Sequence, residues 1–265
     1  MVDIHTHIMP GVDDGARTMD NALEMARIAA ADGITTMAAT PHAYWMGDII
    51  EGREILERVK EVNIAIQEAG IPLKVVSGCE VPMDRRLVER LRDDAGWTYC
   101  GSNVYLLLEP PWGSLPENCF SLVDGLLERG ITPVIAHPER NAELQSDLAP
   151  LDRLIQQGCL AQVNANSILG RHGRPAKATA LRLVETQRLH IVASDSHNIE
   201  NRAPILSEAR AYVERVLGAE AGERLFVENP QRVVDGLPLY ALPHSGSGVE
   251  DRKRGFLSRI FGKRR

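Results

Sequence analysis

Short apolar runs alternate with longer helical patterns along this 265-residue chain, and this alternation restricts the fold more than any other feature. An apolar, β-branched run followed by a helix is the pattern of a strand that returns to a parallel neighbour through a crossover. Several helical patterns end at glycine, the residue favoured at helix C-termini. Gly33, Gly70 and Gly130 each precede an isoleucine that opens the next apolar run. The pattern predicts an α/β fold with parallel strands.

We expect seven strands, each followed by a helix. The strand ranges are 2–5, 35–40, 73–80, 103–109, 132–137, 160–164 and 189–195. The helix ranges are 19–32, 50–69, 84–93, 117–130, 147–157, 175–187 and 203–218. Seven such units in a chain of this length suggest one closed or nearly closed barrel over residues 1–243 instead of two domains.

The composition restricts the class of protein. Apolar residues make up 44% of the chain and charged residues 25%, which is typical of a globular protein. No run reaches the roughly 18 to 20 apolar residues of a membrane-spanning helix. The first residues lack the basic-then-apolar pattern of a secretory signal, and the four cysteines include no CxxC pair. We therefore expect a soluble cytoplasmic protein with reduced thiols.

The charge is distributed unevenly. The formal net charge is −6, yet residues 250–265 contain seven basic and two acidic side chains. The remaining chain is thus strongly acidic and would repel a phosphate backbone, so nucleic acid is not expected as a partner.

The last segment, residues 244–265, is expected to be a flexible linker followed by a basic amphipathic tail. Its apolar side chains share one helical stripe: Phe256, Leu257, Ile260 and Phe261. Such a segment can lie on an anionic membrane surface. A disordered cationic tail and a helix packed on a neighbouring subunit are the alternatives, and the oligomeric state stays open.

Potential metal ligands follow nearly every predicted strand. They are His5, His7, Asp14, His42, Glu80, Glu109, His137, Asp195 and His197. Side chains at the carboxyl ends of parallel strands gather at one edge, so we expect these residues to meet. A single HxH motif is weak evidence, because buried histidines without a metal are common. Buried carboxylates together with imidazoles, however, are expensive unless cations neutralise them.

The number of candidates exceeds the four to six ligands of one transition metal ion, so two or three ions sharing carboxylates are expected. Clustered divalent ions acidify water and stabilise in-line displacement at phosphorus, which points to phosphoester hydrolysis. Arg140, three residues after His137, can bind a phosphoryl group with two parallel N–H donors. Arg202 is a second candidate for the same role.

The ordered motifs of this chain resemble those of the PHP (polymerase and histidinol phosphatase) superfamily over about residues 1–240. The motifs are His5-Thr6-His7, Thr40-Pro41-His42, Gly78-x-Glu80, His137-Pro138-Glu139-Arg140 and Asp195-Ser196-His197. Within the superfamily, residues 3–8 and 12–16 are similar to the bacterial manganese-dependent tyrosine-protein phosphatases of capsule and exopolysaccharide operons. Histidinol phosphatases usually have a histidine where this chain has Asp14.

The resemblance implies a distorted (β/α)7 TIM-like barrel of the PHP type with three divalent ions, manganese in the first place and iron, cobalt or zinc as alternatives. The first ion would bind His5, His7, Glu80 and Asp195. Glu80 would bridge to a second ion held by Glu109 and His137, and Asp14, His42 and His197 would hold the third. Arg140 and Arg202 would be the catalytic residues that grip the phosphoryl group.

The resemblance also implies a substrate. Family members act on the autophosphorylated tyrosine tail of a membrane-bound bacterial tyrosine kinase, and a metal-bridging hydroxide would attack phosphorus in line. This would place the protein in the cytoplasm, at the inner face of the membrane. The alternatives are a phosphatase of a small monoester such as histidinol phosphate, an amidohydrolase, and a non-catalytic metal-binding scaffold.

Overall fold

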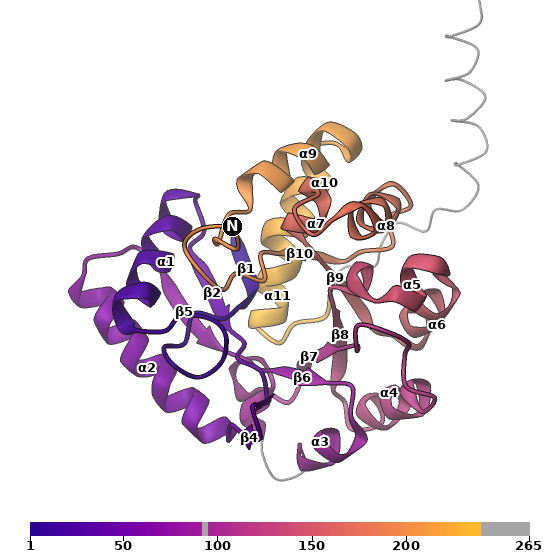
Figure 1. Cartoon of the computed structure of the whole chain (residues 1–265), viewed down its shortest axis with the longest axis horizontal. Coiled ribbons are helices and arrows are strands. Elements are labelled where there is room, and N and C mark those ends of the chain that lie inside the picture. The colour runs from indigo at the N-terminus through magenta and orange to yellow at the C-terminus, as the bar shows by residue number, and fades with distance from the viewer. Residues whose placement is uncertain (92–94, 240–265) are drawn as a thin grey trace, which may run out of the picture.

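Parallel strands lie at the centre of the structure, and helices surround them (Figure 1). The computed structural model describes residues 1–91 and 95–239. One parallel sheet has the order β1-β2-β5, and a second has the order β10-β9-β8-β7-β6. The strands are β1 (Val2–Thr6), β2 (Thr36–Ala39), β5 (Lys74–Ser77), β6 (Glu80–Pro82), β7 (Tyr105–Glu109), β8 (Thr132–Ala136), β9 (Leu160–Asn164) and β10 (Ile191–Ala193).

Helices connect the strands, and most of them lie around the outside of the sheets (Figure 1). They are α1 (Met19–Ala31), α2 (Gly52–Glu68), α3 (Arg85–Arg90), α4 (Cys119–Leu127), α5 (Ala142–Ser146), α6 (Ala149–Gln157), α7 (Ala165–Leu169), α8 (Arg174–Glu185), α9 (Ser207–Leu217), α10 (Ala219–Glu223) and α11 (Asn229–Val234). The Thr18 hydroxyl caps α1 by accepting the Asn21 N–H. In α2, Ile55, Val59 and Ile66 are buried at helical spacing, which gives the helix its sheet-facing stripe.

The predicted α/β class is confirmed, but one predicted strand is wrong. Residues 73–80 form no continuous strand, because the chain passes from β5 in one sheet to β6 in the other at Gly78 and Cys79. The approach is close here: a Cβ at Gly78 would lie 3.0 Å from the Tyr99 ring and 3.1 Å from Thr40.

Two isolated bridges relate the sheets, His42 to Glu80 and Thr6 to Ser196. The paired strands thus form two parallel sheets that these two bridges join, which confirms the parallel α/β class and leaves the closed or nearly closed barrel as a prediction.

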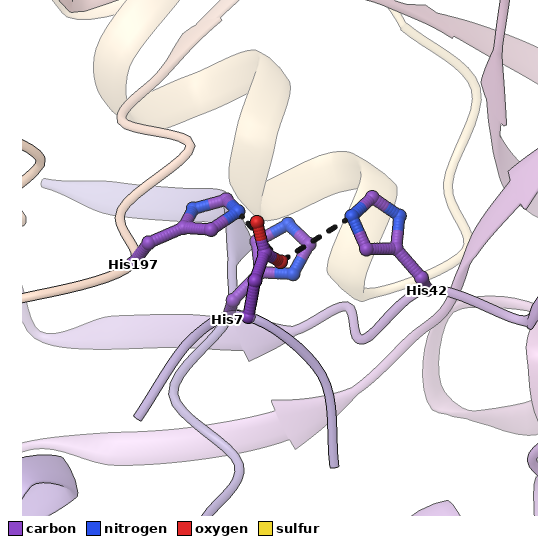
Figure 2. A group of neighbouring side chains, drawn as sticks. His7, His42 and His197 are labelled. Carbon is purple, nitrogen blue, oxygen red and sulfur yellow. Dashed lines mark ion pairs between the residues drawn. The ribbon is translucent and has the colours of Figure 1, made fainter. Parts of the chain in front are cut away.

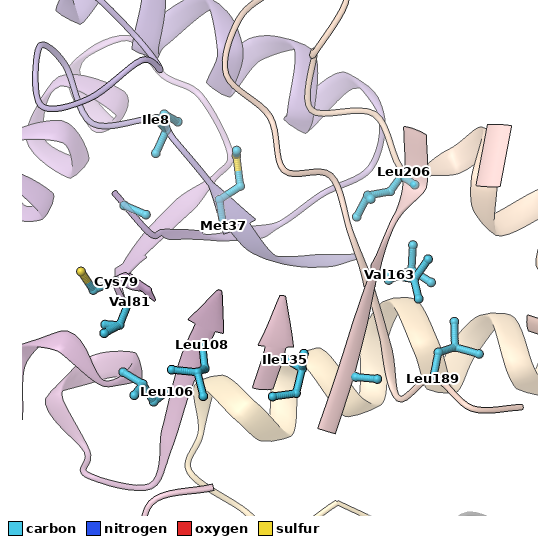
Figure 3. Packing of buried hydrophobic residues seen from close by; sticks show 14 of the residues in the cluster. Ile8, Met37, Cys79, Val81, Leu106, Leu108, Ile135, Val163, Leu189 and Leu206 are labelled. Atoms are coloured by element: carbon cyan, nitrogen blue, oxygen red, sulfur yellow. The ribbon is translucent and has the colours of Figure 1, made fainter. Parts of the chain in front are cut away.

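The apolar core divides between the two faces of the strands. The larger cluster joins alternate strand residues such as Met37, Leu108 and Ile135 to the surrounding helices (Figure 3). The other face carries Ile4, Leu107 and their neighbours. Burial on both faces explains why the strands read as nearly continuous apolar runs. Polar residues within these strands therefore stand out.

Several elements had no counterpart in the sequence-based expectation. A two-stranded antiparallel hairpin, β3 (Tyr44–Trp45) with β4 (Asp48–Ile49), follows β2. Short helices α5, α7, α10 and α11 are also additional. Within residues 1–91 and 95–239, no helix combines the length and apolarity needed to cross a bilayer. The predicted linker and basic tail, residues 244–265, lie outside the described residues.

Candidate metal centre

A β-bulge in β1 positions the first two histidines. The register of β1 on β2 shifts between Asp3 and Thr6, so β1 has one residue more than its partner in this stretch. An extra residue changes the face to which the following side chains point. His5 then reaches Gln162 of β9, with 2.9 Å between His5 Nδ1 and Gln162 Oε1. His7, two residues later, points to the same place.

The loop after β1 closes tightly over His7. The Ala16 N–H donates to the His7 carbonyl at 2.9 Å, and the Gly11 N–H donates to the Ala16 carbonyl at 2.8 Å. The chain runs so close to His7 that a Cβ at Gly15 would lie only 2.0 Å from the His7 carbonyl oxygen. Glycine is therefore required here for a close approach of two backbone segments. The loop places Asp13 beside His7 Nδ1 and Asp14 beside His197 Nε2.

Two further candidates leave their strands in a left-handed conformation. His137 follows β8 with φ 30°, and Asp195 follows β10 with φ 53°. Side-chain-bearing residues rarely adopt this region, at a cost of about 1 to 3 kcal/mol, and such residues cluster at functional sites. The turn ends each strand earlier than predicted and directs each side chain toward Glu80 and His5, respectively.

All nine predicted candidate ligands converge, with the Glu80 carboxylate at the centre. Glu80 Oε1 lies 3.0 Å from His137 Nε2 and 3.2 Å from His5 Nε2. Glu80 Oε2 lies 3.1 Å from His42 Nδ1 and 3.3 Å from His7 Nε2. His5, His7, Glu80 and Asp195 are almost completely buried.

The remaining candidates join the cluster at its open side. Asp14 Oδ1 lies 3.3 Å from His197 Nε2 and 3.6 Å from His42 Nε2. Figure 2 shows the rings of His7, His42 and His197, which come from three separate segments, pointing toward one another. Glu109 Oε2 lies 3.8 Å from His42 Nδ1. The predicted convergence is confirmed, whereas the role of each side chain as a ligand stays a prediction.

Hydrogen-bond acceptors behind the rings fix three imidazole tautomers. His5 Nδ1 faces the Gln162 amide oxygen, His7 Nδ1 lies 2.7 Å from Asp13 Oδ2, and His197 Nδ1 lies 3.0 Å from the Asp195 carbonyl oxygen. Because each of these oxygens can only accept, each Nδ1 carries a hydrogen and each Nε2 presents its lone pair to the cluster. This arrangement is the usual one around metal-binding histidines.

The donor set fits divalent cations. His5 Nε2 and His7 Nε2 lie only 3.4 Å apart and both face Glu80, so two lone pairs meet a carboxylate. A cation or additional protons must separate these groups. Among the described residues, three groups have ligand atoms within 4.8 Å of one another. They are His7, Asp14, His42 and His197; His5, His7 and Glu80; and His42, Glu80 and Glu109. His137 and Asp195 border these groups.

The electrostatics of the cluster show how tightly its charges are coupled. Burial would lower the pKa of His7, but the Asp13 and Glu80 carboxylates raise it to about 10. Burial likewise opposes protonation of His42, whose pKa is raised to about 11 by Asp14 and Glu80. Burial would raise the pKa of Glu80, yet His5 and the other imidazoles hold it well below its usual range. The buried carboxylates thus favour positive charge within the cluster, whether protons or divalent cations supply it.

Two arginines close the pocket beside Asp195. Arg140 Nη1 donates to Asp195 Oδ2 at 2.7 Å, and Arg202 Nη2 donates to Asp195 Oδ1 at 2.9 Å. Asn164 also donates to Oδ2, at 2.7 Å. Burial opposes ionisation of Asp195, but His5 and Arg202 lower its pKa nonetheless. Both arginines line a pocket of about 370 Å³ that opens onto the cluster.

Sequence reasoning missed the residues that support the cluster from behind. Asp13 accepts from His7, and Gln162 donates to the Asn164 side chain while accepting from His5. Gln162 and Asn164 occupy alternate positions of the otherwise apolar β9, on one face. Two amide side chains two residues apart in an otherwise apolar, buried strand indicate a polar centre, and this pattern is visible in the sequence.

Comparison with known proteins agrees with this geometry. The family model described as "Capsular polysaccharide synthesis, CpsB/CapC" matches residues 1–235. Tyrosine-protein phosphatase YwqE of Bacillus subtilis is 34% identical over 246 residues, which cover 92% of this chain and 95% of the relative. Tyrosine-protein phosphatase CpsB of Streptococcus pneumoniae is 28% identical over 239 residues, covering 88% of this chain and 98% of the relative.

A solved structure is also similar throughout. This structure is one of the crystal structures of YwqE from Bacillus subtilis and CpsB from Streptococcus pneumoniae. Both proteins are described as unique metal-dependent tyrosine phosphatases. The TM-score is 0.86 at 33% identity, and the match covers 92% of this chain and 98% of that chain. The family model spans every segment that supplies the cluster. The chain therefore belongs to the CpsB/CapC family of capsular polysaccharide synthesis.

Proposed function

We propose that this chain is a metal-dependent protein-tyrosine phosphatase that hydrolyses phosphotyrosine in a protein substrate. The observation that carries the proposal is the convergence of five imidazoles and four carboxylates beside two arginines in one pocket. YwqE and CpsB, to which the chain is similar over most of its length, are named tyrosine-protein phosphatases. The family match favours this function over a histidinol phosphatase, an amidohydrolase or a non-catalytic scaffold.

We expect three bound ions, with manganese as the metal. The nine candidate ligands, from His5 to His197, would hold them. When bound, they would supply an acidified water and positive charge opposite the phosphoryl oxygens. The three overlapping groups of ligand atoms and the shared position of Glu80 support this number. The chain would close as a distorted seven-stranded barrel over residues 1–243, and the two bridges between the sheets support that closure.

The two guanidinium groups would bind and orient the phosphoryl group. Each arginine has five N–H donors, and one of them donates to Asp195. The donors on the pocket side can therefore grip phosphoryl oxygens and stabilise the charge that develops there. A tyrosine phenolate, whose conjugate acid has a pKa of about 10, leaves more easily than an alkoxide. The reaction thus depends less on a proton donor.

The substrate in the cell would be the phosphorylated tail of a membrane-bound bacterial tyrosine kinase that controls capsule or exopolysaccharide synthesis. The protein would act in the cytoplasm at the inner face of the membrane, with the basic tail, residues 244–265, on anionic lipid. The match to a capsular polysaccharide synthesis family supports the pathway. Co-sedimentation of the full chain and of residues 1–245 with anionic liposomes tests the tail, and equal pelleting would contradict its role.

The activity is tested by turnover of matched phosphopeptides. The protein is stripped with a chelator and reconstituted with manganese, and phosphate release from a phosphotyrosyl peptide is compared with release from histidinol phosphate. We expect activity only in the reconstituted protein and a higher kcat/KM for the phosphotyrosyl peptide. Activity that survives chelation, or a preference for histidinol phosphate, would contradict the proposal.

A further inference from the structure

Aromatic side chains gather at the mouth of the pocket, although they are scarce in this chain. Aromatic residues make up 5% of the sequence, with three tryptophans in all. Two of these, Trp45 and Trp112, line the pocket together with Tyr44. Trp112 is 60% exposed and Tyr44 is 50% exposed, whereas the third tryptophan, Trp97, is completely buried. Large apolar side chains left open beside a reactive centre are a sign of a ligand that covers them.

The hairpin after β2 holds one side of this aromatic group. The Trp45 ring stacks on the His42 ring, with 5.3 Å between centroids and 9° between planes. Tyr44 pairs with Ile49 across the hairpin. The hairpin begins only two residues after His42, so its aromatic side chains are positioned by the same segment that positions a candidate ligand.

The loop after β7 holds the other side. The Arg140 guanidinium carbon lies 4.2 Å from the centroid of the Trp112 ring, and the His137 ring lies 6.4 Å from it at 18°. The Trp112 carbonyl accepts the Ala142 N–H at 2.9 Å, and the Asn141 side chain donates to the Pro111 carbonyl at 2.6 Å. Trp112 is thus fixed against the segment that carries the phosphoryl-binding arginine, although its ring is mostly exposed.

The two sides flank the centre of the cluster. His42, beneath Trp45, and His137, beside Trp112, both lie within 3.1 Å of Glu80. A phosphoryl group bound at the cluster would direct its ester substituent outward between these aromatic groups. An aryl substituent would cover apolar surface and stack on the rings, whereas a short alkyl substituent would leave that surface open.

We propose that Tyr44, Trp45 and Trp112 form a subsite for the aromatic ring of an aryl phosphate, and that this subsite gives the enzyme its selectivity for aryl over alkyl phosphoesters. The proposal rests on the proposed function, since it assigns the recognition of tyrosine to residues outside the metal cluster. Arg140 links the two functions, because its guanidinium contacts both Asp195 and the Trp112 ring.

Calorimetric titration with two non-hydrolysable ligands tests the subsite without turnover. Phenylphosphonate and methylphosphonate share the phosphoryl-like head and differ only in the ring. We expect the manganese-loaded protein to bind phenylphosphonate about tenfold more tightly than methylphosphonate. Trp112→Ala and Tyr44→Ala should each reduce this preference to about threefold or less, with methylphosphonate affinity within about twofold of wild type. Trp112→Phe should retain most of the preference.

Met46→Ala is the matched control, because Met46 lies on the same hairpin, is 88% exposed and does not line the pocket. This variant should keep the wild-type preference. An unchanged preference in both Trp112→Ala and Tyr44→Ala would overturn the subsite. Equal weakening of both ligands in Trp112→Ala would do so too, because it would show that Trp112 acts only through Arg140.

Different results would contradict the proposed function and the proposed subsite. If wild-type protein prefers phenylphosphonate in a Trp112-dependent way but does not hydrolyse a phosphotyrosyl peptide, the function is wrong and the subsite stands. If it hydrolyses the peptide without any preference for phenylphosphonate, the function stands and the subsite is wrong.

Discussion

Gly15→Ala provides a sharp test of how the loop after β1 positions the centre. The added Cβ would lie 2.0 Å from the His7 carbonyl oxygen and 2.5 Å from the His7 Cβ. Real Cβ contacts are essentially never shorter than 3.0 Å, so the two backbone segments must separate by about 1 Å. Ligand distances in metal sites tolerate only about 0.2 Å. A displacement of His7 by several times that amount should lower metal affinity at least about 100-fold and cost about 1 to 3 kcal/mol of stability.

Competition with a fluorescent chelator measures the affinity of the variant for manganese, and urea unfolding measures its stability. Gly125→Ala is the matched control, since Gly125 lies in α4 and a Cβ there meets no atom within 4 Å. That change should leave manganese affinity unchanged and stabilise the helix by about 0.5 to 1 kcal/mol. The reasoning is refuted if Gly15→Ala binds manganese as tightly as wild type in a folded protein.

Three further predictions follow from individual contacts. Asp13→Asn should lower manganese affinity about 10- to 100-fold, because Asp13 orients His7 through its Nδ1; affinity equal to wild type in chelator competition would contradict this role. Arg140→Ala should weaken inhibition by inorganic phosphate about 10- to 100-fold, because the phosphate loses one charged hydrogen-bond donor. The metal content should be retained. Loss of metal in elemental analysis would assign Arg140 to the metal site instead. Burial lowers the pKa of His190 to about 4, below its unfolded value near 6.5, so the stability contributed by the neutral ring is lost as pH falls through this range. His190→Asn should remove about 3 kcal/mol of the stability difference between pH 7.5 and pH 4, as measured by urea unfolding, and an unchanged pH dependence would refute it.

The fold could be predicted where the sequence is strongly periodic. Long amphipathic helices such as α2 and apolar strands such as β9 were found at nearly the expected positions. Helices of five or six residues, such as α5 and α7, are too short to show a helical period. The break in the strand at Gly78 was not predicted. The apolar run continues from β5 into β6, although the chain changes sheets between them.

The candidate centre could be predicted because parallel strands bring their carboxyl ends together, whatever the distances along the chain. The supporting residues could not be found in the same way. Asp13 was visible only as a neighbour of Asp14, and its position behind His7 depends on the close turn at Gly15. Trp112 is not among the predicted site residues, because its contact with Arg140 joins two different loops and leaves no pattern within one segment.

Anomalous diffraction from crystals grown with manganese tests the central claim most directly. Difference maps recorded at the manganese absorption edge should show three peaks, each about 2.0 to 2.3 Å from side-chain atoms of the nine candidate ligands, with Glu80 shared between two peaks. Maps without peaks in this pocket, or peaks bound by other side chains, would contradict the account.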